Sequence, residues 1–306
     1  MRLVFAGTPA VAVPTLRALT EHHEVAGVVT RPDAHLGRKR TLTPSPVAQA
    51  AEELGLPVIK TAKLDDEATA NIAGLDAELG VIVAYGGIVR EPLLSAPAHG
   101  WINLHFSLLP AWRGAAPVQR ALIAGDAELG VSVFQLVPAL DAGDVFAKQA
   151  VAVPSDVTAD VALDLLAADG ARVTAEVVDA IAAGTARSRP QSGEPTLAPK
   201  LMLEDGALDW AQPVASVFAR YRGVTPEPGA HTTIAGDRLK ILVAAPATDA
   251  PPLAPGEILG TRTAVLIGAG DGALEVTRVQ PAGKGPMNAA DWWRGLRAEN
   301  TVRAGS

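Results

Sequence analysis

The first half of the chain alternates short β-rich runs with Ala-rich helical stretches, and this alternation constrains the fold more than any other feature. The runs occupy residues 2–7, 25–30, 56–60, 79–86, 100–107 and 131–137. Strands that are separated by helices are typical of an α/β domain with a mostly parallel, Rossmann-like sheet. We therefore expect this fold for the N-terminal part.

Several helix positions are also signalled. Ser45 followed by Pro46 fits an N-cap and a first helical position, and Pro117 can open a second helix. Apolar residues at helical spacing over 161–184 predict two helices, or one that is broken near Gly170.

The character of the sequence changes after Gly184. Residues 185–200 are rich in Pro, Ser and Gly and give the best linker signal, and the runs beyond them look like antiparallel strands joined at Gly-containing turns. Asn288 and Asp291 can cap a final helix. We predict an α/β domain over 1–189, a linker over 190–206, and a small OB-like β-barrel over 207–306.

Length and composition exclude several classes of protein. With 306 residues, the chain is too long for a small binding module and suits two domains. Its net charge of −7 argues against a uniformly basic nucleic-acid binder. It has no cysteine, which excludes disulfides, thiolate metal sites and a Cys nucleophile. The first apolar run is interrupted by Gly7, Pro9 and Pro14, and no later run reaches membrane-spanning length, so we expect a cytoplasmic protein.

Polar residues at the end of one predicted strand mark a candidate site. Asn103 and His105 share one face of that strand because side chains alternate. Open α/β sheets bind ligands at the carboxyl ends of their strands. The alternative is a His and an Asn that are satisfied by backbone hydrogen bonds.

A second predicted strand ends at Pro138, and Asp141 and Asp144 follow in a turn-forming stretch. A carboxylate beside a His and an Asn would complete a set of groups suited to acyl transfer without a covalent intermediate. Alternatively, both aspartates simply stabilise a loop, and the residues alone do not decide between them.

The motif N-x-H-x-S-L-L-P-x-W-R-G-A-A-P-x-Q, which begins at Asn103, resembles the formyltransferases that use 10-formyltetrahydrofolate. The resemblance is closest to the members that act on methionyl initiator tRNA. It extends through FAGTP, PSPV, VAYG, LDAGD and QPAGK, at residues 5–9, 44–47, 83–86, 140–144 and 280–284, and so covers nearly the whole chain.

The resemblance implies that Asn103, His105 and Asp141 are catalytic. The amino group of methionine on initiator tRNA would attack the formyl carbon. Asn103 and His105 would stabilise the oxyanion, and His105 would also shuttle a proton. Asp141 would orient His105 and accept the proton that the amine loses. Because the amine is itself a nucleophile, Ser107 is expected to form a loop rather than to attack.

The resemblance also implies the binding surfaces. The residues expected around 10-formyltetrahydrofolate are Tyr85, Gly86, Gly87, Ser107, Leu108, Leu109, Pro110, Leu136 and Asp144. An ordinary strand-ending turn is the alternative at 85–87. The residues expected to contact tRNA are Arg38, Lys39, Arg40, Lys200 and Lys284. The chain departs from the family pattern at Glu227 and Gly285, which affects the C-terminal RNA contacts. No metal site is predicted.

The basic stretch 31–40 supports a nucleic-acid partner, because four cations against Asp33 give a local charge of 4 − 1 = +3 in an acidic chain. A solvated surface is the alternative. The function implied is formylation of methionyl initiator tRNA for translation initiation. Two other functions stay open: formylation of a small amine such as glycinamide ribonucleotide or an amino sugar, and folate or RNA binding without catalysis. No membrane association and no obligate protein partner are expected.

Overall fold

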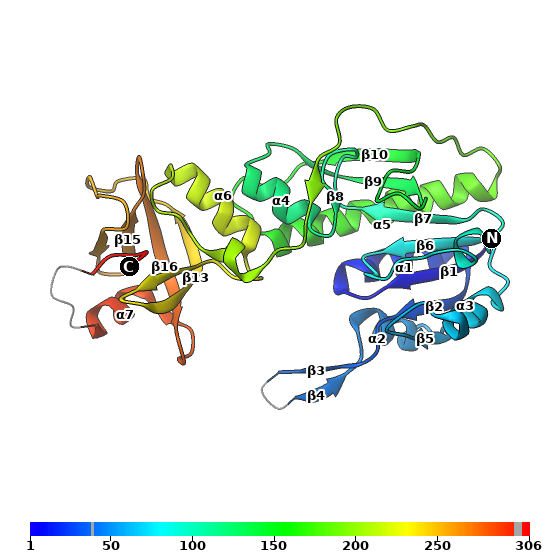
Figure 1. Cartoon of the computed structure of the whole chain (residues 1–306), viewed down its shortest axis with the longest axis horizontal. Coiled ribbons are helices and arrows are strands. Elements are labelled where there is room, and N and C mark those ends of the chain that lie inside the picture. The colour runs from blue at the N-terminus through cyan, green and yellow to red at the C-terminus, as the bar shows by residue number, and fades with distance from the viewer. Residues whose placement is uncertain (38–39, 297–301) are drawn as a thin grey trace. The chain divides into compact units, whose positions relative to one another are not determined.

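The computed structural model describes residues 1–37, 40–296 and 302–306. It contains two compact units (Figure 1). The first unit comprises residues 1–117, 128–152 and 163–198, and the second comprises 118–127, 153–162 and 199–306. This division assigns two short segments inside the predicted N-terminal domain to the second unit. Among the described residues, no helix has both the length and the apolar character needed to cross a membrane.

The first unit is built on a seven-stranded sheet in the order β10-β9-β7-β6-β1-β2-β5. The five strands from β7 to β5 run parallel, and β9 and β10 are antiparallel at one edge. The predicted mostly parallel sheet is thus confirmed. The strands are β1 (Arg2–Gly7), β2 (Glu24–Thr30), β5 (Val58–Lys60), β6 (Leu79–Val83), β7 (Trp101–His105), β9 (Leu129–Gln135) and β10 (Val145–Val151).

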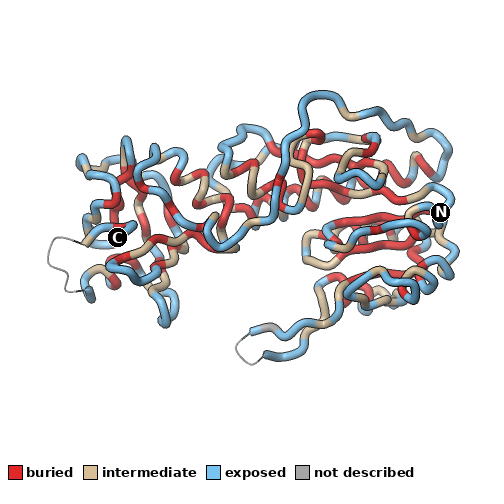
Figure 2. Tube along the Cα trace, in the orientation of Figure 1, coloured by how far each residue is buried: buried red, intermediate tan, exposed pale blue. Residues whose placement is uncertain are grey.

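The central strands of this sheet are buried, as the red tubes in Figure 2 show. The helices and short elements of the first unit are η1 (Ala10–Ala12), α1 (Val13–His22), β3 (Ala34–Leu36), β4 (Thr41–Thr43), α2 (Pro46–Glu53), α3 (Asp66–Ala73), η2 (Leu93–Ser95), β8 (Arg113–Gly114) and β11 (Leu197–Ala198). Helix α2 begins as predicted, because the Ser45 side chain accepts a hydrogen bond from the backbone N–H of Ala48.

Helix α5 (Ala159–Ala182) is continuous, so the predicted break near Gly170 is wrong. Gly170 serves packing instead. A Cβ at this position would lie 2.8 Å from Cδ2 of Leu104, which is buried in β7. The Gly170 carbonyl also accepts the hydroxyl of Thr174 at 2.7 Å. The glycine therefore lets the helix approach the strand that carries Asn103 and His105.

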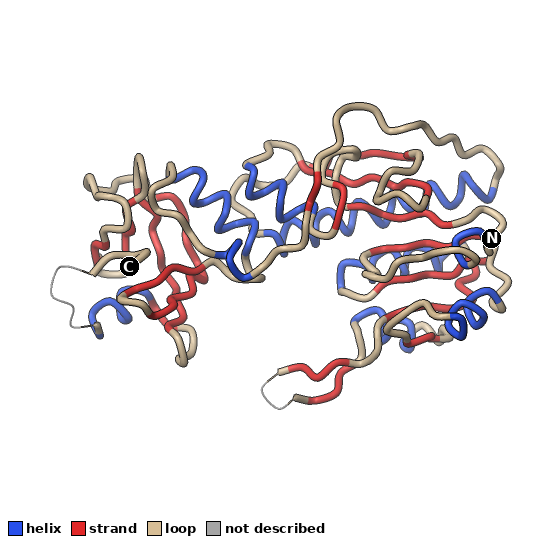
Figure 3. Tube along the Cα trace, viewed as in Figure 1, coloured by secondary structure: helices blue, strands red, loops and turns tan. Residues whose placement is uncertain are grey.

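The segment after α5 lies along the first unit over residues 189–198, and all of it except residue 189 falls within the linker predicted over 190–206. Arg189 and Val145 exchange backbone hydrogen bonds, and β11 pairs in parallel with β8. In Figure 1 this segment is the long yellow-green loop that returns from the end of α5 to β8, and Figure 3 draws most of it as loop. Its contacts anchor it to the sheet domain.

The second unit contains an antiparallel sheet in the order β12-β13-β16-β15-β14, with β17 paired to β16, in agreement with the predicted antiparallel strands. The helix α7 has the predicted cap, since the Asn288 side chain accepts from the backbone of Ala290. The elements are α4 (Pro117–Ala124), η3 (Leu203–Gly206), α6 (Val214–Val224), β12 (His231–Ile234), β13 (Asp237–Pro246), β14 (Ile258–Gly260), β15 (Val265–Gly268), β16 (Ala273–Pro281), β17 (Met287–Asn288) and α7 (Ala289–Gly295).

The C-terminal residues connect the two edges of this sheet. Ala304 forms an antiparallel bridge to Ile234 at the end of β12, and Arg303 forms one to Glu257 just before β14. The backbone N–H of Ala304 donates to Gly256, and that of Gly305 donates to Thr233. The open sheet is thereby bridged in the manner of a small barrel.

Candidate active site

The candidate site lies on β7, which is flanked by β6 and β9. Asn103 pairs with Ile82 on one side and Phe134 on the other. His105 lies two residues further along, on the same face of the strand, and is buried. Its ring meets Phe134 edge-on, with ring centroids 6.3 Å apart.

The His105 ring has a defined tautomer. Its Nε2 lies 2.8 Å from the backbone carbonyl of Trp112. Since a carbonyl only accepts hydrogen bonds, Nε2 carries the proton. Burial lowers the pKa of His105 below its ordinary value, although Asp141 and the Trp112 carbonyl both oppose this shift. The ring is therefore neutral at pH 7, and the unprotonated Nδ1 is its free acceptor.

Asp141 is the carboxylate that faces this ring. Its Oδ2 lies 3.8 Å from Nδ1 of His105 and accepts a hydrogen bond from the backbone N–H of Gly114 at 2.8 Å. The first distance is too long for a hydrogen bond, but it is short enough for a charge interaction once the ring takes up a proton. Asp144 is exposed. The geometry thus separates two aspartates that residue type and turn position alone do not distinguish.

Asn103 contributes an unusual feature, because its side-chain Oδ1 is buried without a hydrogen-bond partner among the described residues. Buried polar atoms are normally paired, and exceptions often mark a place where a ligand binds. The predicted amide, imidazole and carboxylate thus share one region: two lie on one strand face, and the third faces His105.

The predicted folate residues differ in what they present. The Tyr85 side chain is buried, and burial raises its pKa. A Cβ on Gly87 would lie 2.4 Å from the Tyr85 ring, so this glycine makes room for that ring. Only the backbone of Tyr85 can therefore meet a ligand. Gly86 has a φ of +76°, and its Cβ position is open.

The predicted loop 107–110 is fixed by internal hydrogen bonds. The Ser107 hydroxyl donates to Ala111 at 2.6 Å, which agrees with the expected loop-forming role. The Ser132 hydroxyl binds both Ser107 and Leu109, and Lys148 donates to the Leu109 carbonyl at 2.7 Å. Leu108 and Pro110 belong to this loop, and Leu136 follows β9 and donates its N–H to Trp101.

Sequence reasoning missed several residues that shape the site. Gln191, Thr196 and Lys148 bind backbone or side-chain groups of the loops around His105 and Asp141. Gln191 and Thr196 lie in the Pro- and Ser-rich segment, where no periodic signal exists. Trp112 and Arg113 belong to the motif that begins at Asn103, so the motif itself could have drawn attention to them.

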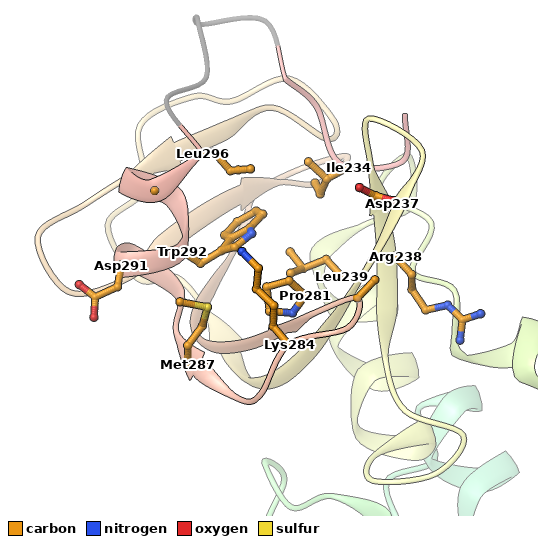
Figure 4. Close-up of a pocket in the computed structure, with 12 residues that line it drawn as sticks. Ile234, Asp237, Arg238, Leu239, Pro281, Lys284, Met287, Asp291, Trp292 and Leu296 are labelled. Atoms are coloured by element: carbon orange, nitrogen blue, oxygen red, sulfur yellow. The ribbon is translucent and has the colours of Figure 1, made fainter.

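The predicted tRNA residues lie in both units. Arg38 and Lys39 fall outside the described residues. Arg40 is exposed, and its carbonyl accepts from Nδ1 of His35. Lys200 is exposed in the second unit. Lys284 lines a cavity of about 240 Å³, and its side chain points toward Trp292 (Figure 4).

Two family models match the chain: "Formyl transferase" over residues 1–178 and "Formyl transferase, C-terminal domain" over 200–297. The chain belongs to the formyl transferase family. It is 59% identical over 303 residues to the methionyl-tRNA formyltransferase of Clavibacter sepedonicus, with 99% of each chain covered. It is also 59% identical to the enzyme of that name from Leifsonia xyli, with 98% of this chain and 99% of the relative covered.

A solved structure shows the same fold at much lower identity. It is the N-formyltransferase from Helicobacter canadensis in complex with folinic acid and dTDP-3-aminofucose. It superposes with a TM-score of 0.70 at 15% identity and covers 91% of this formyltransferase and 98% of its own chain. The fold is thus shared with an N-formyltransferase that was solved with an amino-sugar nucleotide.

Proposed function

We propose that this formyltransferase moves the formyl group of 10-formyltetrahydrofolate to the amino group of methionyl initiator tRNA, for translation initiation. The observation that carries the proposal is the 59% identity, over nearly the whole chain, to relatives named methionyl-tRNA formyltransferase. Formylation of an amino sugar is less well supported, since the neighbour solved with such a ligand is only 15% identical.

Asn103, His105 and Asp141 carry the chemistry in this proposal. When bound, the folate supplies the formyl carbon. The side-chain amide of Asn103 donates to the developing oxyanion, where a preorganised donor is most effective. The N–H at Nε2 of His105 already donates to the Trp112 carbonyl, so the ring has no second N–H for the oxyanion. Its Nδ1 instead accepts the proton of the attacking amine, and this replaces the roles that the resemblance implied for His105 and Asp141. The Asp141 carboxylate, 3.8 Å from Nδ1, stabilises the resulting imidazolium. His105 would then give this proton to the departing folate nitrogen as the bond between that nitrogen and the formyl carbon breaks.

The described residues fit a folate donor. The unpartnered Oδ1 of Asn103 needs a donor, which a ligand can supply. At Gly86 the backbone is open to close approach. We propose that the backbone at 85–87 and the loops 107–110 and 136–144 bind the pterin, and that Arg38, Lys39, Arg40, Lys200 and Lys284 contact tRNA, mostly through phosphates.

An acceptor assay tests the function. The purified enzyme is given 10-formyltetrahydrofolate with a labelled formyl group together with methionyl initiator tRNA, glycinamide ribonucleotide, an amino sugar nucleotide, or no acceptor. We expect label only on the tRNA-bound methionine, and formylation that weakens as salt rises. Label on a small amine alone would refute the tRNA assignment, and no turnover would favour a binding protein.

A further inference from the structure

An extended segment crosses the loops that surround His105. This segment, residues 189–198, is called the strap. It begins with the backbone pairing of Arg189 to Val145 and ends where Ala198 accepts hydrogen bonds from the backbone of Ala115 and Ala116. Its position between these two anchors brings its side chains onto the loops that carry Asp141 and Trp112.

The side chain of Gln191 joins two of these loops. Its Oε1 accepts from Nε and Nη2 of Arg113, at 3.1 and 2.7 Å. Its Nε2 donates to the carbonyls of Asp141 and Gly143, at 2.7 and 2.9 Å. Because guanidinium groups only donate and carbonyls only accept, the amide has one possible orientation. All four contacts lie within the first unit.

The loop that Gln191 holds has a conformation that needs support. Asp141 has a φ of +44°, in the left-handed region that is unfavourable for residues other than glycine. At Gly143 the loop passes so close to β9 that a Cβ would lie 1.7 Å from the Gln135 carbonyl. The two bonds from Gln191 bracket this turn, and the Asp141 carboxylate then faces Gly114 and His105.

The second strap contact acts on the other partner of His105. Trp112 has a φ of +61°, and its backbone N–H donates to Oγ1 of Thr196 at 2.8 Å. Its carbonyl accepts Nε2 of His105. The strap backbone adds a bond from the N–H of Arg113 to the Thr196 carbonyl. The Asp141 carboxylate and the Trp112 carbonyl, which face the two nitrogens of His105, both belong to loops that the strap holds in place.

We propose that the strap is the positioning element of the active site, in which Gln191 holds the carboxylate of Asp141 and Thr196 holds the carbonyl of Trp112, each against one nitrogen of His105. The proposal rests on the catalytic roles proposed for His105 and Asp141. Gln191 and Thr196 are positioning residues: they touch neither nitrogen, and they act through the groups that do.

A double-mutant cycle tests Gln191. Single-turnover formylation with enzyme in excess is measured for wild type, Gln191→Leu, Asp141→Asn and the double variant, with the acceptor that wild type formylates. We expect Gln191→Leu to lower the rate about 10–100-fold in the wild-type background, the scale of a misplaced catalytic group. In the Asp141→Asn background we expect a further loss below about twofold, because the group that it positions is already gone.

Two further variants separate positioning from folding. Gln191→Glu keeps the acceptor for Arg113 but cannot donate to the two carbonyls, so we expect it to lose rate like Gln191→Leu while its melting temperature stays near that of wild type. The control is Gln149→Leu, because Gln149 likewise accepts from an arginine, Arg172, and donates to a second group, Asp169, on the surface of the same unit. It should keep full activity.

Thr196 offers a conservative rescue. Thr196→Val removes the acceptor at nearly unchanged shape, whereas Thr196→Ser retains it. We expect the valine variant to lose rate and to change the ¹⁵N shifts of the His105 ring, which report its tautomer, and the serine variant to restore both. Equal ring shifts in Thr196→Val and wild type would refute the role of Thr196.

The outcomes are distinct from those of the acceptor assay. If the acceptor is not tRNA, the acceptor assay with the wild-type enzyme shows this by itself. The mutant cycle remains valid, because it uses the acceptor that wild type formylates. Equal losses from Gln191→Leu in both backgrounds, or no loss in either, would overturn the role of Gln191. Full activity in Asp141→Asn would remove the catalytic role of Asp141 and the positioning proposal with it.

Discussion

The environment of His105 decides which proton chemistry it can perform. One ring nitrogen donates to a backbone carbonyl and the other faces a carboxylate at 3.8 Å. Burial favours the neutral ring, so Nδ1 is an acceptor beside a second acceptor. A single proton on Nδ1 would turn it into a donor toward the Asp141 carboxylate. This arrangement suits a residue that receives a proton during the reaction and then releases it.

The pH dependence of the free energy of unfolding should reflect the burial of His105. In the folded state the pKa of His105 lies below the value of about 6.5 in the unfolded chain, so below that pH the unfolded chain binds more protons. The stabilisation is therefore fully present above about pH 6.5 and is lost as the pH falls toward the lower folded-state pKa. In His105→Gln this dependence is absent. Urea unfolding between pH 7.5 and 5 should show the stability of wild type relative to this variant falling with pH.

The matched control is Asn71→Gln on the surface of α3, which changes no titratable group. Its stability relative to wild type should stay constant over the same pH range. A constant difference between wild type and His105→Gln would contradict the burial of a neutral ring.

Asn103 allows activity and stability to be separated. Asn103→Ala removes the proposed oxyanion donor, so we expect formylation to fall about 100-fold or more. Because Oδ1 is buried without a partner, its loss costs no hydrogen bond, and the free energy of unfolding should change by less than about 1 kcal/mol. Rates and urea unfolding are compared with Asn71→Ala on the surface of α3. Near-normal turnover in Asn103→Ala would refute the role.

The sequence predicts the positions of some side chains in the site but not of others. Strand alternation alone puts Asn103 and His105 on one face. It does not distinguish Asp141 from Asp144, because the left-handed turn that aims Asp141 is held by Gln191, 50 residues further along the chain. Strand alternation also does not predict that the Tyr85 ring is buried. This burial depends on Gly87, where any side chain would collide with the ring.

Strands and helix starts were the most predictable elements. Apolar runs and capping residues are local signals, and they placed the central strands and α2. The predicted break in α5 is wrong because a glycine within a helical pattern gives the same sequence signal whether it interrupts the helix or makes room for a neighbouring side chain. Most of the strap falls within the predicted linker, because the segment is rich in Pro, Ser and Gly and has no period. Its bonds go to distant loops, and such bonds leave no local signal in the sequence.

The pairing of β6 with β7 depends on one glycine. Gly80 lies opposite Trp101, and a Cβ there would be 2.1 Å from the buried indole ring. The ring is also held by its N–H bond to Leu93, so it cannot easily move. We expect Gly80→Ala to lower the free energy of unfolding by about 2–3 kcal/mol, measured by urea denaturation.

Gly285→Ala is the control for this change, because no described residue lies within 4 Å of its Cβ position and no left-handed φ restricts it. It should leave stability unchanged within about 0.5 kcal/mol. A Gly80→Ala variant as stable as the control would mean that the strand pair adapts to the added methyl group.

Some of the contacts that stabilise the folded chain give no local signal in the sequence, and the contacts of its last residues are an example. Residues 303–305 add bonds to both edges of the antiparallel sheet in the second unit, although they are few and include no β-branched or aromatic residue that would predict a strand. Ala304 is buried at this junction. The stability of the second unit should therefore depend on residues at the far end of the sequence.

Ala304→Asp tests this dependence. It buries a carboxylate beside both sheet edges, and we expect the second unit to lose about 2–4 kcal/mol. Tryptophan fluorescence follows its unfolding, since Trp210, Trp292 and Trp293 lie there. Ala245→Asp makes the same change at an exposed position of β13 and should cost under about 1 kcal/mol. If both variants unfold alike, the C-terminal residues do not hold the sheet edges together, and the barrel is stable as an open sheet.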